Sequence, residues 1–185
     1  MGNLEQAYLK FLHEKPNSLP QKILAGFLRF LSFFYLAGWT VKKTAHYAGL
    51  TRRRRLACPV ISVGNITTGG TGKTPVVIFL AQHFSAQGKR VAVLSRGYGR
   101  SARAPKRLWV SDGKSLLATP AQGGDEPVLI ARKVPQAAVL VGKDRYRSGL
   151  EAMERFKPDL FILDDGFQRR YEFHRDLDII VIDGI

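Results

Sequence analysis

The residues best suited to do chemistry lie in a glycine-rich stretch between two apolar segments. Residues 67–75 read TTGGTGKTP, after Pro59–Val63 and before Val76–Leu80. Backbone N–H groups of such a loop converge on phosphate oxygens, a lysine reaches the outer phosphates, and the next hydroxyl binds magnesium. We therefore expect phosphoryl transfer or nucleotide hydrolysis. The nucleotide-binding candidates are Thr67, Thr68, Gly69, Gly70, Thr71, Gly72, Lys73 and Thr74.

The spacing of this loop is a variant. In the strict pattern G-x-x-x-x-G-K-[ST] a glycine stands where this chain has Thr67. Pro75 fits the first turn of a helix, where its missing N–H costs nothing. A glycine-rich turn without a ligand is the alternative interpretation.

A pair of adjacent carboxylates, Asp164 and Asp165, ends another apolar run, Phe161–Leu163. In nucleotide-binding folds with a phosphate loop, an acidic residue at this place holds magnesium directly or through water. Two carboxylates beside a bound triphosphate would repel it unless a cation lay between them. We therefore predict that Thr74, Asp164 and Asp165 bind Mg²⁺, with a plain Asp-Asp-Gly turn as the alternative.

Asp125 opens a predicted helix directly after Gly124. An aspartate there is a natural N-cap. It could equally accept the proton of an acceptor hydroxyl as a general base. The local sequence leaves both roles open.

Several arginines stand near predicted element ends. Arg96 and Arg100 follow a strand in the run SRGYGR, and Arg145 lies at a helix start. The planar guanidinium group matches phosphate oxygens, so we assign all three as candidates for binding a phosphate of the nucleotide or acceptor. Solvated positions at the surface are the alternative.

The elements that position these residues alternate between strand and helix, which is typical of a parallel sheet with crossover helices. We predict an α/β fold with flanking helices, like that of P-loop NTPases, whose ligands bind at the carboxyl ends of the strands. Residues 106–113 are expected to form a small hairpin within a long loop, 97–124. The expected strands are Val60–Val63, Arg90–Leu94, Ala137–Val141, Leu160–Leu163 and Leu177–Ile182, and the expected helices are Thr74–Gln87, Glu126–Val134 and Lys143–Phe156.

The N-terminal part has a different character. The net charge of the chain is +14, and an apolar segment, Ile23–Val41, contains one charged residue, Arg29. On a helix its polar residues form a stripe opposite a wide apolar face, so we predict an amphipathic helix in the membrane interface. A single span and a helix buried on its own domain are the alternatives. The cations at 42–43 and 52–55 would meet anionic lipid headgroups. If the segment spans the membrane, the same charges would keep the following domain cytoplasmic.

Composition excludes other classes. The single cysteine, Cys58, rules out an internal disulfide and a cysteine-rich zinc site. No motif of a nucleic-acid-binding module accompanies the arginine run, so we expect no nucleic-acid partner. The predicted domains are a membrane-associating segment, 1–58, and a nucleotide-binding core, 59–185.

Taken together, the motifs resemble the tetraacyldisaccharide 4′-kinases, the lipid A 4′-kinase family of Gram-negative bacteria. The matching motifs, in order, are Gly64-Asn65, Gly69-Gly70-Thr71-Gly72-Lys73-Thr74-Pro75, Ser95-Arg96-Gly97-Tyr98-Gly99, Gly124-Asp125-Glu126-Pro127, Asp164-Asp165-Gly166-Phe167-Gln168 and Arg175-Asp176-Leu177-Asp178.

The resemblance implies transfer of the γ-phosphate of ATP to the 4′-hydroxyl of a lipid A disaccharide 1-phosphate precursor, at the cytoplasmic face of the inner membrane. It implies that Lys73 and its loop hold ATP, that Thr74 and the aspartate pair handle Mg²⁺, and that Asp125 activates the acceptor. Gln168 joins Arg96, Arg100 and Arg145 as a candidate for binding substrate or phosphate.

Two features depart from that family. Arg169 stands where family members often have histidine. The family also continues into a C-terminal lobe that supplies a histidine partner for the catalytic aspartate, and we expect this chain to lack that lobe. A membrane-associated P-loop ATPase or switch, and an inactive lipid-binding fragment, are the alternative functions.

Overall fold

The computed structural model describes residues 19–47, 54–65, 72–98, 100–101, 105–167 and 173–182. The chain divides into two compact units, Met1–Arg52 and Arg53–Ile185. The sequence predicts a boundary after residue 58, whereas residues 54–58 belong to the second unit. Their inclusion follows from the side chain of Leu56, which is buried in the core of that unit.

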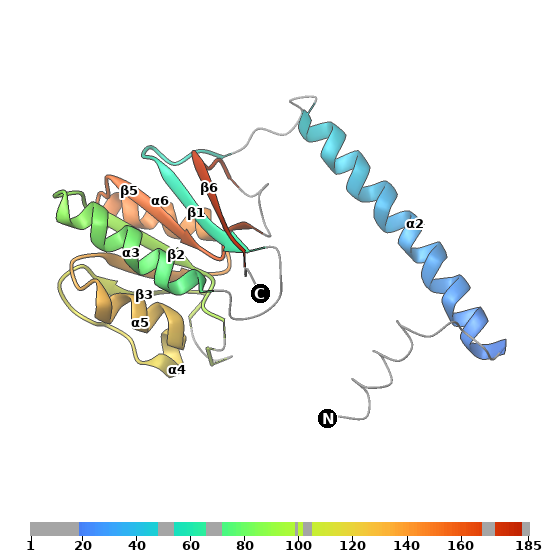
Figure 1. Ribbon diagram of the computed structural model, residues 1–185, viewed down its shortest axis with the longest axis horizontal. Helices are drawn as coiled ribbons and strands as arrows, with labels where there is room; N and C mark the ends of the chain where they lie inside the picture. Colours follow the sequence, from blue (N-terminus) through green and yellow to red (C-terminus); the bar gives the residue numbers. More distant parts are fainter. Residues whose placement is uncertain are drawn as a thin grey trace. The chain divides into compact units, whose positions relative to one another are not determined.

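The described part of the first unit is a long continuous helix, α2 (Leu19–Tyr47), drawn in blue in Figure 1. Its large apolar side chains, such as Phe27 and Phe34, are exposed. By length and composition, Lys22–Val41 is the one stretch of the described chain that could cross a membrane.

The second unit is built on a six-stranded sheet with the strand order β3-β4-β2-β5-β1-β6. All neighbouring strands are parallel except β3 and β4. The strand bounds are β1 Val60–Asn65, β2 Val91–Ser95, β3 Arg107–Asp112, β4 Ala138–Gly142, β5 Leu160–Asp164 and β6 Leu177–Val181. Each expected strand is present, with ends that agree within two residues.

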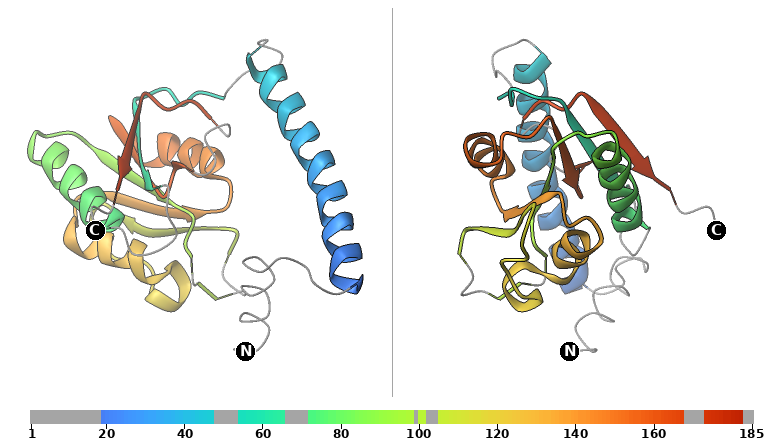
Figure 2. Two further views of the ribbon diagram at one scale, coloured as in Figure 1. Left: turned by 45° about the vertical axis from the view of Figure 1, so that its right-hand side comes forward. Right: turned by 90° about the vertical axis from the view of Figure 1, so that its left-hand side faces the viewer.

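Helices cover both faces of this sheet. The right-hand view of Figure 2 shows α6 (Arg145–Arg155) on one face and α3 (Lys73–Ala86) with α5 (Asp125–Lys133) on the other. Side chains of a strand alternate between the two faces. In β2, Val91 and Val93 accordingly join the core under α3 and α5, while its alternate residues join the core under α6.

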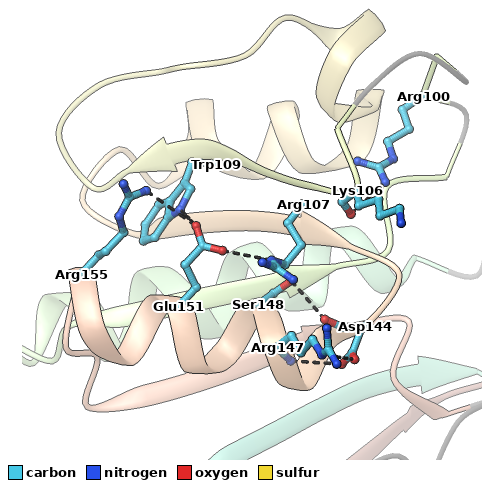
Figure 3. A network of polar contacts seen from close by, with 9 residues as sticks. All are labelled: Arg100, Lys106, Arg107, Trp109, Asp144, Arg147, Ser148, Glu151 and Arg155. Atoms are coloured by element: carbon cyan, nitrogen blue, oxygen red, sulfur yellow. Dashed lines mark hydrogen bonds and ion pairs between the residues drawn. The ribbon is translucent and has the colours of Figure 1, made fainter.

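Residues 106–113 do not form the predicted hairpin, because Arg107–Asp112 form one strand, β3, which pairs with β4. The chain turns back on β3 only after residue 112: Leu117 N–H donates to the carbonyl of Val110 at 2.8 Å, and Ser111 forms an antiparallel bridge with Leu116. A short helix, α4 (Pro120–Gly123), lies in the expected long loop. Figure 3 shows how β3 is fastened to α6: Glu151 accepts hydrogen bonds from Trp109 Nε1 at 2.6 Å and from Arg107 Nε at 3.1 Å. The partner of an edge strand is set by such distant contacts, which local alternation of residue types does not reveal.

Candidate active site

The candidate residues gather at the carboxyl edge of the parallel strands. β2 ends at Ser95 and β5 at Asp164, and the two strands are neighbours in the sheet. On the other side of β5, Val63 of β1 is paired with Asp164. The strand that leads into the phosphate-loop sequence therefore lies beside the strand that ends in the two aspartates.

Two residues of the predicted phosphate loop begin α3. Lys73 and Thr74 are its first residues, both partly buried, and Gly72 precedes them as N-cap with φ 75°. A positive φ of this size favours glycine, which explains the residue type at position 72. The N–H groups of the first helical turn have no partner within the helix, so this end of α3 suits an anion. The remaining predicted loop residues, Thr67, Thr68, Gly69, Gly70 and Thr71, lie outside the described residues.

Asp164 is the most perturbed acid of the site. Its side chain is 1% exposed, and Ser95 Oγ donates a hydrogen bond to its Oδ2 at 2.9 Å. Burial raises the pKa of Asp164 to about 6, against the Ser95 hydrogen bond, which lowers it. The charges of Glu126 and Asp165 raise this pKa further and that of Lys73 lowers it, so these groups lie within electrostatic reach of the carboxylate.

Two carboxylate oxygens of this site are buried without a hydrogen bond from any residue that the structure describes. They are Oδ1 of Asp164 and Oδ1 of Asp165. Buried polar atoms normally have hydrogen-bond partners, so two buried carboxylate oxygens without one indicate a place for a ligand. Mg²⁺ is usually bound by one or two carboxylates together with substrate phosphates. The residues present therefore fit Mg²⁺, although the described chain has no cluster of three or more possible metal ligands.

Asp125 lies at the same edge, but it is not an N-cap. Gly124, with φ 92°, occupies the N-cap position of α5, and Asp125 is the exposed first residue of the helix. Of the two roles that the sequence left open for Asp125, the structure does not show the capping one, because the N-cap lies one residue earlier, at Gly124, and the helix has no side-chain cap hydrogen bond. Gly124 also packs against the carbonyl of Tyr98, which brings the start of α5 next to the loop that follows β2.

The predicted phosphate-binding arginines have different surroundings. Arg96 is exposed immediately after β2. Arg100 donates hydrogen bonds to the carbonyls of Pro105 at 2.9 Å and Lys106 at 3.3 Å, as Figure 3 illustrates for Arg100 and Lys106. Arg145 is buried, and its Nη1 donates to the carbonyl of Asp165 at 2.8 Å. Their roles toward phosphate remain predictions. Gln168 lies outside the described residues.

Two contributors to the site stand in motifs of the sequence, but no role was predicted for either of them. Ser95 and Arg175 both contact the turn after β5, Ser95 through Asp164 and Arg175 through the carbonyl of Gly166 at 2.7 Å. Ser95 could have been recognised as a site residue from its position directly after a predicted strand. Nothing near Arg175 in the sequence indicates its partner.

Comparison with known proteins agrees with this geometry. A family model described as "Tetraacyldisaccharide-1-P 4'-kinase" matches residues 24–185. A tetraacyldisaccharide 4'-kinase of Syntrophus aciditrophicus is 53% identical over 85% of the chain, and one of Geobacter sulfurreducens is 51% identical over 77%. These alignments span 41% and 40% of the relatives' own lengths, less than half in each case.

A solved structure shows the same fold. The crystal structure of LpxK from Aquifex aeolicus in complex with ATP is 41% identical and superposes with a TM-score of 0.70, over 85% of this chain and 48% of the other. The predicted α/β architecture, a mainly parallel sheet with flanking helices preceded by an apolar helix, is confirmed.

Proposed function

Because this chain belongs to the tetraacyldisaccharide-1-P 4'-kinase family, we propose that it forms the nucleotide-binding part of a lipid kinase. The enzyme transfers the γ-phosphate of ATP to the 4′-hydroxyl of a tetraacylated disaccharide 1-phosphate, a precursor of lipid A. The observation that carries the proposal is the pairing of Val63 with Asp164, since it sets the strand before the phosphate loop beside the acidic turn.

Lys73 and Thr74 act on the nucleotide in this proposal. The start of α3 offers unpaired backbone N–H groups to phosphate oxygens, and the Lys73 ammonium group neutralises charge on the outer phosphates. Phosphoryl transfer needs little covalent chemistry from the protein, so position and charge supply most of the rate enhancement.

Asp164, Asp165 and Thr74 would hold Mg²⁺. Oδ1 of each aspartate has no hydrogen-bond partner among the described residues, and Thr74 is partly buried at the start of α3. When bound there, Mg²⁺ neutralises charge that develops on the β- and γ-phosphates. The Ser95 hydroxyl favours the ionised form of Asp164, because it donates to the carboxylate and lowers its pKa.

Asp125 serves as the general base for the sugar hydroxyl. It is exposed at the site edge, and it is free of the capping role that would have occupied its carboxylate. A carboxylate so placed can accept the proton of the 4′-hydroxyl as the new O–P bond forms. Arg96, on the loop after β2, is an exposed cation that can bind an acceptor phosphate.

The location that suits this function is the cytoplasmic face of the bacterial inner membrane, with α2 as the membrane-associating element. The apolar side chains of α2 are exposed, and its hydroxyls bond to its own backbone: Ser32 Oγ donates to the carbonyl of Leu28 at 2.8 Å and Thr40 Oγ1 to that of Leu36 at 2.8 Å. Polar groups satisfied within the helix cost little in an apolar environment. The basic residues at 42–43 and 52–55 would bind anionic lipids.

The test is transfer of label from γ-labelled ATP to a tetraacylated disaccharide 1-phosphate in mixed micelles. It uses this chain and a chimaera in which the chain replaces the matching part of the Syntrophus aciditrophicus relative. The expected result is label in the lipid fraction, dependent on the acceptor and abolished by Lys73→Ala. Release of inorganic phosphate without lipid labelling would instead identify a membrane-associated ATPase.

A further inference from the structure

The turn that carries the two aspartates has an unusual backbone. Asp165 adopts φ 54°, a left-handed conformation that non-glycine residues rarely take. Gly166 follows, and its N–H donates to the carbonyl of Val63 at 3.0 Å. A Cβ at position 166 would collide with the Ser62 side chain, so the turn lies tightly against β1. Such a conformation persists only where surrounding contacts hold it.

Two buried arginines supply those contacts through three consecutive carbonyl groups. Arg145 Nη1 donates to the carbonyls of Asp164 at 3.3 Å and Asp165 at 2.8 Å. Arg175 Nη1 donates to the next carbonyl, that of Gly166, at 2.7 Å. Arg145 is 3% exposed as a residue, and the Arg175 side chain is 5% exposed. Burying a guanidinium group is costly unless it is well bonded, so both groups stay where these acceptors lie.

The two arginines come from different parts of the fold. Arg145 is the first residue of α6, whose N-cap Asp144 accepts a hydrogen bond from the Arg147 N–H at 3.0 Å. Arg175 precedes β6 and also pairs with Asp178 of that strand at 3.3 Å. The backbone of the turn is thus fastened to a helix and to a strand at once.

We propose that Arg145 and Arg175 are positioning residues that bind the backbone of the Asp164–Gly166 turn and so hold the two carboxylates in the arrangement that binds Mg²⁺ with the nucleotide. This proposal rests on the proposed function, which makes the aspartates the metal ligands. It differs from the role predicted for Arg145 in the sequence, since Arg145 acts here through carbonyl groups and not on a phosphate.

The test measures how much Mg²⁺ strengthens ATP binding. The Kd for ATP is determined by calorimetry with excess Mg²⁺ and with EDTA, on the unsubstituted chain and on Arg145→Lys and Arg175→Lys. A lysine keeps the charge, but its side chain is shorter than that of arginine and lacks the planar guanidinium group, so it cannot reproduce the contacts of Arg145 Nη1 or of the two Arg175 Nη atoms. Removal of groups that orient metal ligands typically costs about 10–100-fold in metal affinity, so the Mg²⁺ enhancement should fall by about that factor. The Kd in EDTA should stay unchanged.

The matched control is Arg155→Lys, at the other end of α6. Arg155 lies over the Trp109 ring and pairs with Glu151 (Figure 3), and neither of these contacts involves the turn. It should leave both Kd values unchanged. Thermal melting of each variant verifies folding, and two independent variants keep the test decisive if one of them unfolds.

The other outcomes separate the two proposals. If Arg145→Lys weakens ATP binding equally in EDTA, Arg145 contacts phosphate and the positioning role is overturned. An unchanged Mg²⁺ enhancement in both variants also overturns it, while the proposed function stands. If Mg²⁺ does not strengthen ATP binding to the unsubstituted chain, the metal assignment of Asp164 and Asp165 fails, and the positioning role fails with it.

Discussion

The hydroxyl of Ser95 donates a 2.9 Å hydrogen bond to the carboxylate of Asp164 inside the protein. The two residues end neighbouring strands, so the sheet itself brings them together. One hydrogen bond offsets only part of the cost of a buried charge, and the pKa of Asp164 is still raised to about 6 by burial. Ionisation of this carboxylate is therefore less favourable in the folded protein than in the unfolded chain.

Asp164→Asn should stabilise the protein without ligand at neutral pH. Because the pKa of Asp164 is higher in the folded than in the unfolded chain, its contribution to stability is full below the ordinary value of 3.8 and is lost as pH rises through about 6. The amide carries no charge, so the free energy of unfolding should rise by about 1–3 kcal/mol at neutral pH. Denaturant unfolding at several pH values measures this, and the gain should vanish near pH 4. A gain that is independent of pH would contradict the explanation.

Ser95→Ala should shift the pH dependence of Mg²⁺-assisted ATP binding. Protons compete with the metal for Asp164, so the Mg²⁺ enhancement should grow as pH rises through about 6. The Ser95 hydrogen bond lowers the pKa of Asp164, so its removal should move the midpoint to higher pH. Ser111→Ala is the matched control, since this buried hydroxyl bonds the Ala137 carbonyl elsewhere. Equal midpoints in all three proteins would argue against Asp164 as a ligand.

Lys73→Ala should weaken ATP binding even without metal. Hydrogen bonds to charged groups contribute about 1.5–3 kcal/mol, which corresponds to roughly ten- to hundredfold in Kd. Calorimetry in EDTA isolates this effect from the metal. Lys89→Ala, an exposed lysine beyond the other end of α3, should bind ATP normally. Similar Kd values for the two variants would refute the phosphate-loop assignment.

Asp125→Asn should separate chemistry from folding. Gly124 is the N-cap of α5, so the substitution removes only a favourable charge in the first turn, worth less than about 1 kcal/mol. If Asp125 is the general base, kcat of the chimaera should fall by about 10²–10⁴ while ATP affinity is kept. Steady-state kinetics and thermal melts measure both, with Glu154→Gln as a control on the exposed side of α6. Near-normal turnover would remove Asp125 from the mechanism.

Two substitutions on α2 test its apolar face and its polar stripe, and carbonate extraction distinguishes a helix in the membrane interface from a helix that spans. Phe34→Lys places a charge on the apolar face and should lower binding to anionic vesicles about tenfold or more. Ser32→Lys adds a cation to the polar stripe and should keep or raise binding. Vesicle flotation measures the bound fraction. Carbonate extraction should release the unsubstituted chain, and retention in the pellet would favour a span instead.

The sequence predicted best what depends on local patterns. Buried apolar runs such as residues 91–94 are continuous, so every strand except β3 was located within two residues. Contacts between residues that are far apart in the sequence could not be predicted. The partner of β3 depends on Glu151, and the role of Arg175 depends on a carbonyl group in the turn after β5. The cap of α5 was misplaced by one residue because a glycine with positive φ, Gly124, begins that helix.

The strand order also has a consequence for the growing polypeptide. Among the strands of this sheet β1 comes earliest in the chain, yet it lies between β5 and β6, which come after the other four. Contacts between distant parts of a chain form slowly, because a long loop must close before they are made. During translation β1 therefore waits without either neighbour, and the pairing of Val63 with Asp164 is completed only after β5 has left the ribosome. If ATP binds where the proposed function places it, it can stabilise only a domain in which β1 and β5 have already paired, and it cannot guide the early stages of folding.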